Sequence, residues 1–150
     1  MSMPSISFMD HAIACAEQAS HREEIPVGAV IVLNNKIVSA SGNNVFSQLD
    51  PTAHAEIVAI RQACQTLGQH RLDGCDIYVT LEPCALCAAA ISLARIRTVY
   101  FGAYDPKGGA IEHGPRFFEQ ATCHHRPHVV GGIQEEHCSQ LLKYFFGDKR

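Results

Sequence analysis

Residues 75–103, "CDIYVTLEPCALCAAAISLARIRTVYFGA", contain two apolar runs on either side of a helical pattern. The runs "CDIYVTL" (75–81) and "RTVYFGA" (97–103) have the length and composition of buried strands, and "PCALCAAAISLARI" (83–96) is typical of a helix with proline at its start. A strand, a helix and a strand in this order form a βαβ unit, whose two strands are parallel. The sequence therefore predicts an α/β fold, with a mixed sheet sandwiched by helices.

The regions around this unit carry further periodic patterns. Apolar residues recur at intervals of three and four before and after it, as on one face of a helix, and the pair Asn34-Asn35 tolerates the left-handed backbone of a tight turn. We expect a helix at 8–19, a β-hairpin at 27–41, a helix from Pro51 to the stop at Gly68, a short edge strand within 128–133, and a closing helix at 135–146 with Cys138, Leu141, Leu142 and Phe145 inward.

Length and composition indicate one globular unit. The chain has 150 residues, of which 47% are hydrophobic, so we expect a single domain at 1–150. No segment approaches the ~18 apolar residues of a membrane span, and the first residues lack a secretion signal, so we expect no membrane association and a cytoplasmic location. Seven cysteines, two of them in Cys-x-x-Cys, favour metal ligation or free thiols over a disulfide framework.

The net charge argues against a general nucleic-acid binder. It is −3, with a pI near 6.3. Residues 1–94 hold four Lys/Arg and nine Asp/Glu (4 − 9 = −5), whereas residues 95–150 hold eight and six (8 − 6 = +2). An ordinary scatter of surface charge explains this asymmetry, and a local basic surface on the last third of the chain is the alternative.

Two short motifs carry residues that bind metals. "DPTAHAEI" (50–57) supplies His54 at the start of one predicted helix, and "LEPCALC" (81–87) supplies Cys84 and Cys87 at the start of the next. Helix N-termini favour thiolates, and residues three apart lie close together around a helix. Two thiolates and an imidazole suit zinc and leave its fourth tetrahedral position open for water, so we expect one catalytic Zn²⁺ per chain.

Glu56 lies two positions after His54 and need not be a zinc ligand. A carboxylate near the open position can take a proton from zinc-activated water and return it to a leaving group. Two other readings remain. Cys-x-x-Cys alone is also typical of a thioredoxin-like redox pair, and a structural zinc would leave Glu56 as a solvated helix residue.

The complete pattern resembles the zinc-dependent nucleoside and nucleobase deaminases, whose His-x-Glu and Pro-Cys-x-x-Cys motifs it shares. Four longer blocks, in order over residues 8–147, resemble the bacterial tRNA-specific adenosine deaminases in particular. They are "EIPVGAVIV" (24–32), "DPTAHAEIVAIRQA" (50–63), "YVTLEPCALCAAAI" (78–91) and "FGAYDPKGGA" (101–110).

This resemblance implies a homodimer with a three-layer α/β/α cytidine-deaminase-like fold around a mixed, mostly five-stranded sheet. It implies hydrolytic conversion of adenosine to inosine at the wobble position of a tRNA anticodon, with the anticodon stem-loop of tRNA-Arg as the expected partner. By motif position, Asn43 would hydrogen-bond the base, Val27 would form a pocket wall, and the N–H of Ala55 would help fix the ring.

The chain departs from the family pattern in two places. It ends at "FFGDKR" without a long basic extension, and Tyr104 stands where a basic residue is common. Both differences bear on how RNA would be held. Phe145 and Phe146 keep an aromatic pair near the end of the chain, which could stack on anticodon-loop bases or pack in the core.

Further candidates lie outside the deaminase motifs. Cys123, His124, His125 and His128 could form a second metal site, a polar loop or an RNA-facing surface. The segment 107–109, Lys-Gly-Gly, is interpreted as a turn that could touch RNA phosphate, and Asp50 as a helix entry residue that could also order the pocket mouth. Cys15, Cys64, Cys75 and Cys138 lie in apolar patterns and are interpreted as core thiols.

Two other functions fit parts of the sequence. A free-nucleobase deaminase acting on guanine or cytosine would share the zinc site without an RNA surface. An RNA-binding subunit with a structural zinc would have no need of a carboxylate at Glu56, and this residue therefore favours an enzyme.

Overall fold

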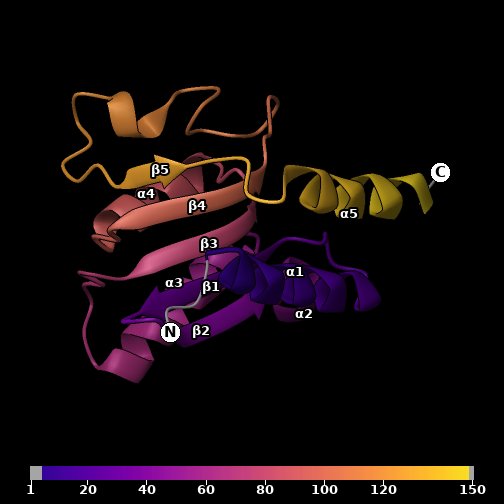
Figure 1. Ribbon diagram of the computed structural model, residues 1–150, viewed down its shortest axis with the longest axis horizontal. Helices are drawn as coiled ribbons and strands as arrows, with labels where there is room; N and C mark the ends of the chain where they lie inside the picture. Colours follow the sequence, from indigo (N-terminus) through magenta and orange to yellow (C-terminus); the bar gives the residue numbers. More distant parts are fainter. Residues whose placement is uncertain (1–4, 149–150) are drawn as a thin grey trace.

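The computed structural model describes residues 5–148 (Figure 1). Its helices are α1 (Ser5–His21), α2 (Val45–Gln48), α3 (Ala55–Leu67), α4 (Ala85–Leu93), the 3₁₀-helix η1 (Phe117–Glu119) and α5 (Glu135–Asp148). Its strands are β1 (Gly28–Leu33), β2 (Lys36–Gly42), β3 (Asp76–Leu81), β4 (Thr98–Ala103) and β5 (His128–Val130). No helix in this part of the chain is both long and apolar enough to span a membrane.

The five strands form one mixed sheet in the order β2-β1-β3-β4-β5. The first half is antiparallel, since β1 pairs with both β2 and β3, and the second half is parallel, since β4 pairs with β3 and β5. The predicted βαβ unit is confirmed as β3-α4-β4, with Asp76 opposite Thr98. The predicted hairpin is β1-β2, and Asn34 and Asn35 turn it with φ values of 51° and 64°.

Helices cover both faces of the sheet, as the three-layer prediction requires (Figure 1). Alternate side chains of β1 and β3 point to opposite faces. On one face, Ile31 and Ile77 pack in the core cluster that includes residues of α3 and α4. On the other, Val30 and Tyr78 pack in a second cluster with α1 and Cys138 of α5. The fold is thus the predicted three-layer α/β/α arrangement around a mixed five-stranded sheet.

Two helices begin later than the sequence predicts. Residues 51–54 form a turn before α3, in which Asp50 Oδ1 accepts hydrogen bonds from the backbone N–H of Thr52 (2.9 Å) and its hydroxyl (2.7 Å). Pro51 therefore precedes the helix by four residues. In the same way, Cys84 is the N-cap of α4, and Ala85 is the first helical residue.

Other boundaries also differ from the prediction. Helix α4 ends at Leu93, because the chain leaves it through Arg95 with φ of 64°. Strand β5 is confirmed at the sheet edge but ends at Val130, before Gly132 with φ of 81°. Helices α2 and η1 have four and three residues. Such short segments carry no detectable periodicity, which is why the sequence did not indicate them.

Candidate metal and base-binding site

The candidate site forms where α3 and α4 begin. His54 is the N-cap residue of α3 and Cys84 is that of α4, while Cys87 lies in the first turn of α4. Strand β3 runs directly into the turn that carries Cys84. The sheet therefore brings the N-termini of two helices together, and their partial positive charges favour anionic groups between them.

Three side chains meet at this point with the geometry of a metal site. His54 Nδ1 lies 3.6 Å from Cys84 Sγ and 3.4 Å from Cys87 Sγ, and all three ligand atoms lie within 4.8 Å of one another. Zinc bonds of about 2.3 Å to sulfur and about 2.0 Å to nitrogen, at tetrahedral angles, give N···S separations of about 3.5 Å. The donor set and its spacing both fit Zn²⁺. Within the described residues, no other His, Cys, Asp or Glu side chains form a comparable group of three.

The two thiols titrate as a pair. The hydrogen bond from Cys87, with further help from His54, lowers the pKa of Cys84 to about 4, and the same pairing with Cys84 raises the pKa of Cys87. The hydrogen bond with Cys84 raises the pKa of His54, although burial opposes this. A thiolate is thus already favoured at Cys84, and a divalent cation would favour deprotonation of both sulfurs.

Glu56 is buried beside these ligands, with 4% of its surface exposed. Burial raises the pKa of Glu56 to about 7, because the loss of solvent outweighs the hydrogen bonds from its own N–H and from Cys87. A buried carboxyl with a pKa near neutrality can both accept and donate a proton at physiological pH. The alternative that Glu56 is a solvated helix residue is therefore wrong, because its side chain is buried.

A cavity of about 200 Å³ opens onto this group. Its wall includes Val27, Asn43 and Ala55, the three residues that the family resemblance indicated as substrate-binding. Asn43 is 8% exposed and is held in place because its Oδ1 accepts a hydrogen bond from the N–H of Val45 (3.3 Å). Ala55 is the first residue of α3, where backbone N–H groups have no partner within the helix.

Sequence reasoning missed several residues of this cavity. They are Ile25, Leu81, Glu82, Asp105 and Gly108. Glu82 stands two positions before Cys84, inside the motif itself, and a carboxylate so close to a metal ligand was a signal that could have been used. Asp105 and Gly108 come from the loop after β4. The block 101–110 resembles the family and 107–109 is interpreted as a turn that could touch RNA phosphate, but neither pattern places this loop in the cavity wall.

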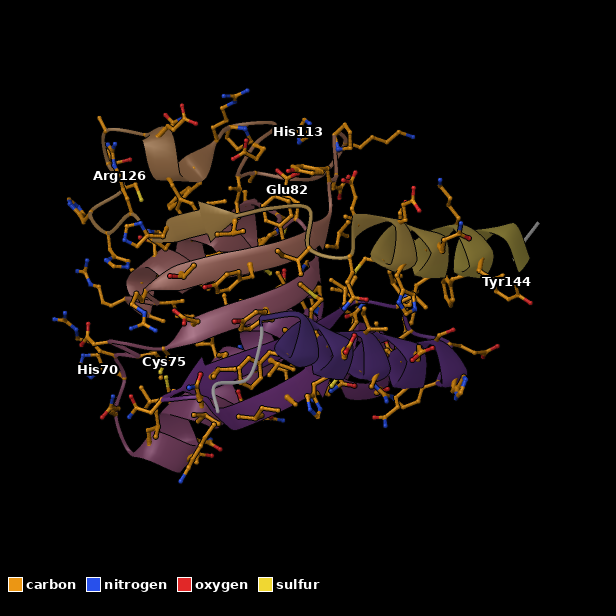
Figure 2. The ribbon with its side chains drawn as sticks, in the orientation of Figure 1. His70, Cys75, Glu82, His113, Arg126 and Tyr144 are labelled. Carbon is orange, nitrogen blue, oxygen red and sulfur yellow. The ribbon has the colours of Figure 1, made fainter. Side chains whose placement is uncertain are left out.

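Two fully buried carboxylates support the loops on either side of the cavity. Glu24 accepts hydrogen bonds from the N–H groups of Phe46 (3.1 Å) and Ser47 (2.7 Å) and from the Ser47 hydroxyl (2.7 Å), which fixes the segment after Asn43. Glu82 does the same for the loop after β4. Figure 2 shows it beyond the carboxyl end of β3, near His113 and at the opposite end of the sheet from Cys75.

Both carboxyl groups have pKa values below their ordinary range. Burial alone would raise the pKa of Glu24 and of Glu82. At Glu24, hydrogen bonds from Ser47 and Phe46 outweigh this effect of burial. At Glu82, hydrogen bonds from the N–H of Asp105 and the ring of His113 outweigh it. Hydrogen bonds to the charged form therefore keep these two carboxylates ionised inside the protein.

The other candidate residues lie outside this cavity. Tyr104 is 39% exposed and packs edge-on against Phe101 and His113. Phe146 is 48% exposed and makes an edge contact with the half-buried Phe145. Asp50 holds the turn before α3 and pairs with Arg61 (3.5 Å), and it is not among the residues of the cavity wall.

The cluster of cysteine and histidines at 123–128 does not form a metal site. The Cys123 thiol is buried and donates to the carbonyl of His125 (3.2 Å), while the His125 ring contacts the carbonyl of Ile96 (2.7 Å). His124 and His128 are exposed. Among the predicted core thiols, Cys75 and Cys138 are buried, whereas Cys15 and Cys64 are half-buried.

The chain is similar to proteins of known function over nearly its whole length. Residues 4–103 match the family described as the cytidine and deoxycytidylate deaminase zinc-binding region. A tRNA-specific adenosine deaminase from Agrobacterium fabrum is 55% identical over 143 residues, which cover 95% of this chain and 94% of that protein. The chain belongs to the tRNA-specific adenosine deaminase family.

Solved structures agree with this membership. A chain from a study of A-to-I editing by tRNA:A34 deaminases at the wobble position of transfer RNA has a TM-score of 0.90 and 55% identity, covering 91% of this chain and 99% of that one. Guanine deaminase from Bacillus subtilis has a TM-score of 0.67 and 41% identity, covering 68% of this chain and 66% of that one. This chain is therefore similar both to a chain from the study of tRNA:A34 deaminases and to a guanine deaminase.

Proposed function

We propose that this protein is a single-domain, zinc-dependent hydrolase that converts adenosine to inosine at the wobble position of a tRNA anticodon. One observation carries the proposal: His54 and Cys84 line the same cavity as Glu56 and Asn43, and Cys87 completes their group of three ligand atoms beside it. The close relatives named as tRNA-specific adenosine deaminases support the choice of substrate. A tRNA substrate also agrees with a cytoplasmic location.

His54, Cys84 and Cys87 would hold one zinc ion per chain. The bound ion would act as a Lewis acid that activates water for attack on the base. We expect elemental analysis to find about one zinc per chain in the parent protein and clearly less in Cys87→Ser, because a hydroxyl is a poorer zinc ligand than a thiolate. A full complement of zinc in both Cys84→Ser and Cys87→Ser would contradict this ligand set.

Glu56 would move the protons of the reaction. Water adds to C6 of adenine, the bond between C6 and the exocyclic nitrogen breaks, and ammonia leaves. One proton of the attacking water goes to N1, where inosine keeps it, and the Glu56 carboxylate takes the other and delivers it to the departing nitrogen as the C6 carbonyl forms. Asn43 and the N–H of Ala55 orient the ring, and Val27 forms an apolar part of the wall.

The size of the cavity agrees with a single base. About 200 Å³ is less than the usual 300–1,000 Å³ of a pocket for a drug-sized ligand. One nucleobase can enter, and the rest of the polynucleotide remains outside. The target must then be unstacked, which an anticodon loop allows at little cost.

A second chain would complete the enzyme as a homodimer. Residues 86, 89, 90 and 93 of α4 follow the i, i+3, i+4, i+7 spacing of one helix face, and all are apolar. Leu86 is 42% exposed and Leu93 is 79% exposed, while the opposite face of α4 packs in the core through Cys87, Ala88 and Ile91. A helix that is apolar on both sides is normally buried on both. Sedimentation analysis of Leu93→Glu should show more monomer than the parent.

The deciding experiment offers zinc-loaded protein an adenosine-bearing anticodon stem-loop, that of tRNA-Arg first, beside free adenosine, guanine and cytosine. We expect inosine in the stem-loop to form far faster than any free-base product. RNA affinity should fall with salt, with a log–log slope of about −2 to −3 for three to five phosphate contacts. The alternative function is deamination of a free nucleobase, and the similarity to guanine deaminase makes guanine the first free base to test. Faster turnover of free guanine or cytosine, without salt-sensitive RNA binding, would establish it.

A further inference from the structure

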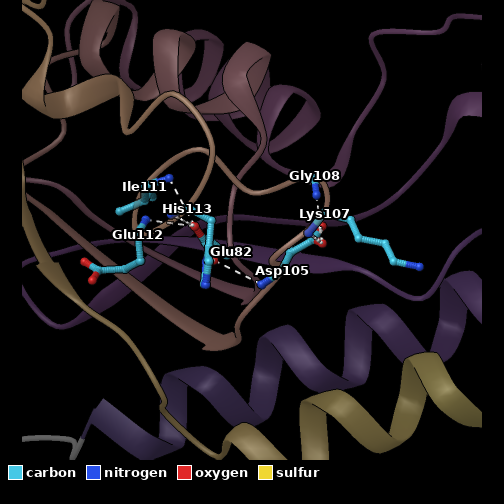
Figure 3. A network of polar contacts seen from close by, with 7 residues as sticks. All are labelled: Glu82, Asp105, Lys107, Gly108, Ile111, Glu112 and His113. Carbon is cyan, nitrogen blue, oxygen red and sulfur yellow. Dashed lines mark hydrogen bonds and ion pairs between the residues drawn. The ribbon is translucent and has the colours of Figure 1, made fainter.

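The buried carboxylate of Glu82 collects five hydrogen bonds from one loop (Figure 3). Its Oε1 accepts from the N–H of Asp105 (3.0 Å) and from Nδ1 of His113 (2.8 Å). Its Oε2 accepts from the N–H groups of three consecutive residues, Ile111 (3.1 Å), Glu112 (2.8 Å) and His113 (3.2 Å). The side chain has no exposed surface. One carboxylate thus gathers both ends of the segment 105–113.

The same loop contributes to the wall of the candidate cavity. Asp105 and Gly108 both belong to the cavity wall. The carboxylate of Asp105 accepts hydrogen bonds from the N–H groups of Lys107 (3.2 Å) and Gly108 (3.0 Å). The position of Gly108 therefore depends on Asp105, and the backbone of Asp105 is in turn bonded to Glu82.

Glu82 also belongs to the turn that carries the metal-ligand candidate Cys84. Its own N–H donates to the carbonyl of Ala103 (2.9 Å), and the carbonyl of Pro83 accepts from Ala110 (2.9 Å). The loop after β4 is therefore attached to this turn through both backbone and side chain. Gly109 is packed so closely here that an added Cβ would lie 2.5 Å from the carbon of the Glu82 carboxylate.

We infer that Glu82 is a positioning residue for substrate recognition: its carboxylate fixes the loop 105–113 and thereby sets Asp105 and Gly108 in the wall of the deaminase cavity. This inference rests on the proposed function for the identity of the substrate. It assigns to Glu82 no contact with the base. The residue acts through the loop, and small displacements of groups that orient a substrate are known to be costly.

The isosteric variant Glu82→Gln tests this role directly. A carboxamide has one acceptor oxygen, so whichever way it is oriented at least one backbone N–H, that of Asp105 or those of Ile111, Glu112 and His113, loses its acceptor and faces an NH₂ group. We expect the KM for the anticodon stem-loop to rise by about tenfold or more, kcat to change by less than about threefold, and one zinc per chain to remain. Backbone amides of Asp105, Ile111, Glu112 and His113 should exchange with deuterium faster than in the parent.

Two further variants keep the test independent of the folding of Glu82→Gln. Gly109→Ala perturbs the same contact without changing a charge, and should raise KM in the same direction. Ile96→Val is the control for a general loss of stability, because Ile96 is fully buried and precedes β4, whereas the loop 105–113 follows it. Its KM should remain that of the parent.

Each result has a defined meaning. Parental KM and parental amide exchange in Glu82→Gln and Gly109→Ala would overturn the inference, as would an equal rise of KM in Ile96→Val. Loss of zinc from Glu82→Gln would also overturn it, since the carboxylate would then support the ligand turn and not the loop. Absence of inosine with the parent protein would instead overturn the proposed function, and the exchange measurement would still decide whether Glu82 holds the loop.

Discussion

Glu56 and Glu82 are two carboxylates in the same cavity wall, and they differ in almost every physical respect except burial. They are 4% and 2% exposed, respectively. Glu56 lies against the thiol of Cys87 and receives a hydrogen bond from its own backbone, and burial raises its pKa to about 7. Glu82 receives five hydrogen bonds from the loop 105–113, and its pKa lies below the ordinary range in spite of burial.

The number of donors explains the contrast. Burial disfavours the charged form of any carboxyl group, and only hydrogen bonds or opposite charges compensate for it. Where donors are few, as at Glu56, the group can exchange its proton near neutral pH. Where they are many, as at Glu82, the charge is fixed and the group organises the backbone around it. One residue type thus supports two roles within a single pocket.

The largest effect is expected at Glu56. Glu56→Gln preserves the shape of the side chain but removes its ability to accept and release a proton, so kcat should fall by at least ~10²-fold. Zinc content and stability should remain those of the parent. Single-turnover assays with the stem-loop, together with elemental analysis, provide the measurement. If Glu56→Gln deaminates the stem-loop within a few-fold of the parent rate, Glu56 does not transfer the protons, and the proposed difference in role between Glu56 and Glu82 is wrong.

An intermediate effect is expected on the free energy of unfolding. Here the substitution of Glu82 should have a larger effect than the substitution of Glu56. Glu82→Gln leaves buried N–H groups without an acceptor and should lower the free energy of unfolding by about 1–3 kcal/mol. Glu56→Gln replaces a buried carboxyl that has few hydrogen-bond donors around it, and should lower the free energy of unfolding by less than Glu82→Gln does. Urea denaturation of the zinc-loaded proteins compares them. Equal losses would show that hydrogen-bond satisfaction is not what separates these sites.

The smallest effect concerns Glu24, a carboxylate of the Glu82 kind on the other side of the cavity. Its pKa is lowered in the folded protein, whereas in an unfolded chain a glutamate titrates at about 4.3. Its contribution to stability is therefore present above pH about 4.3 and is lost as the pH falls through the folded-state pKa. We expect Glu24→Gln to flatten the acid side of the stability curve, measured by urea denaturation between about pH 3 and 7. An unchanged curve would contradict the role of the Ser47 and Phe46 hydrogen bonds.

Much of the fold could be predicted because its signals are local. The apolar runs at 75–81 and 97–103, the pair Asn34-Asn35 and the stop at Gly68 each act within a few residues, and the corresponding elements are present. The starts of the helices were predicted less accurately. The helix expected from Pro51 begins only at Ala55, because the preceding turn is held by hydrogen bonds from Thr52 to Asp50. The short helix α2 is held by the distant Glu24, which accepts hydrogen bonds from the N–H groups of Phe46 and Ser47.

The candidate metal ligands were also determined by the sequence alone. His54, Cys84 and Cys87 are residue types with a strong chemical preference, placed at two helix starts, and their convergence required only that both helices pack on the same face of the sheet. What only the tertiary structure decided is the remainder of the cavity wall. Glu82 and the loop 105–113 meet because parallel strands β3 and β4 end side by side, and hydrogen bonds between residues more than twenty positions apart leave no periodic trace in a sequence.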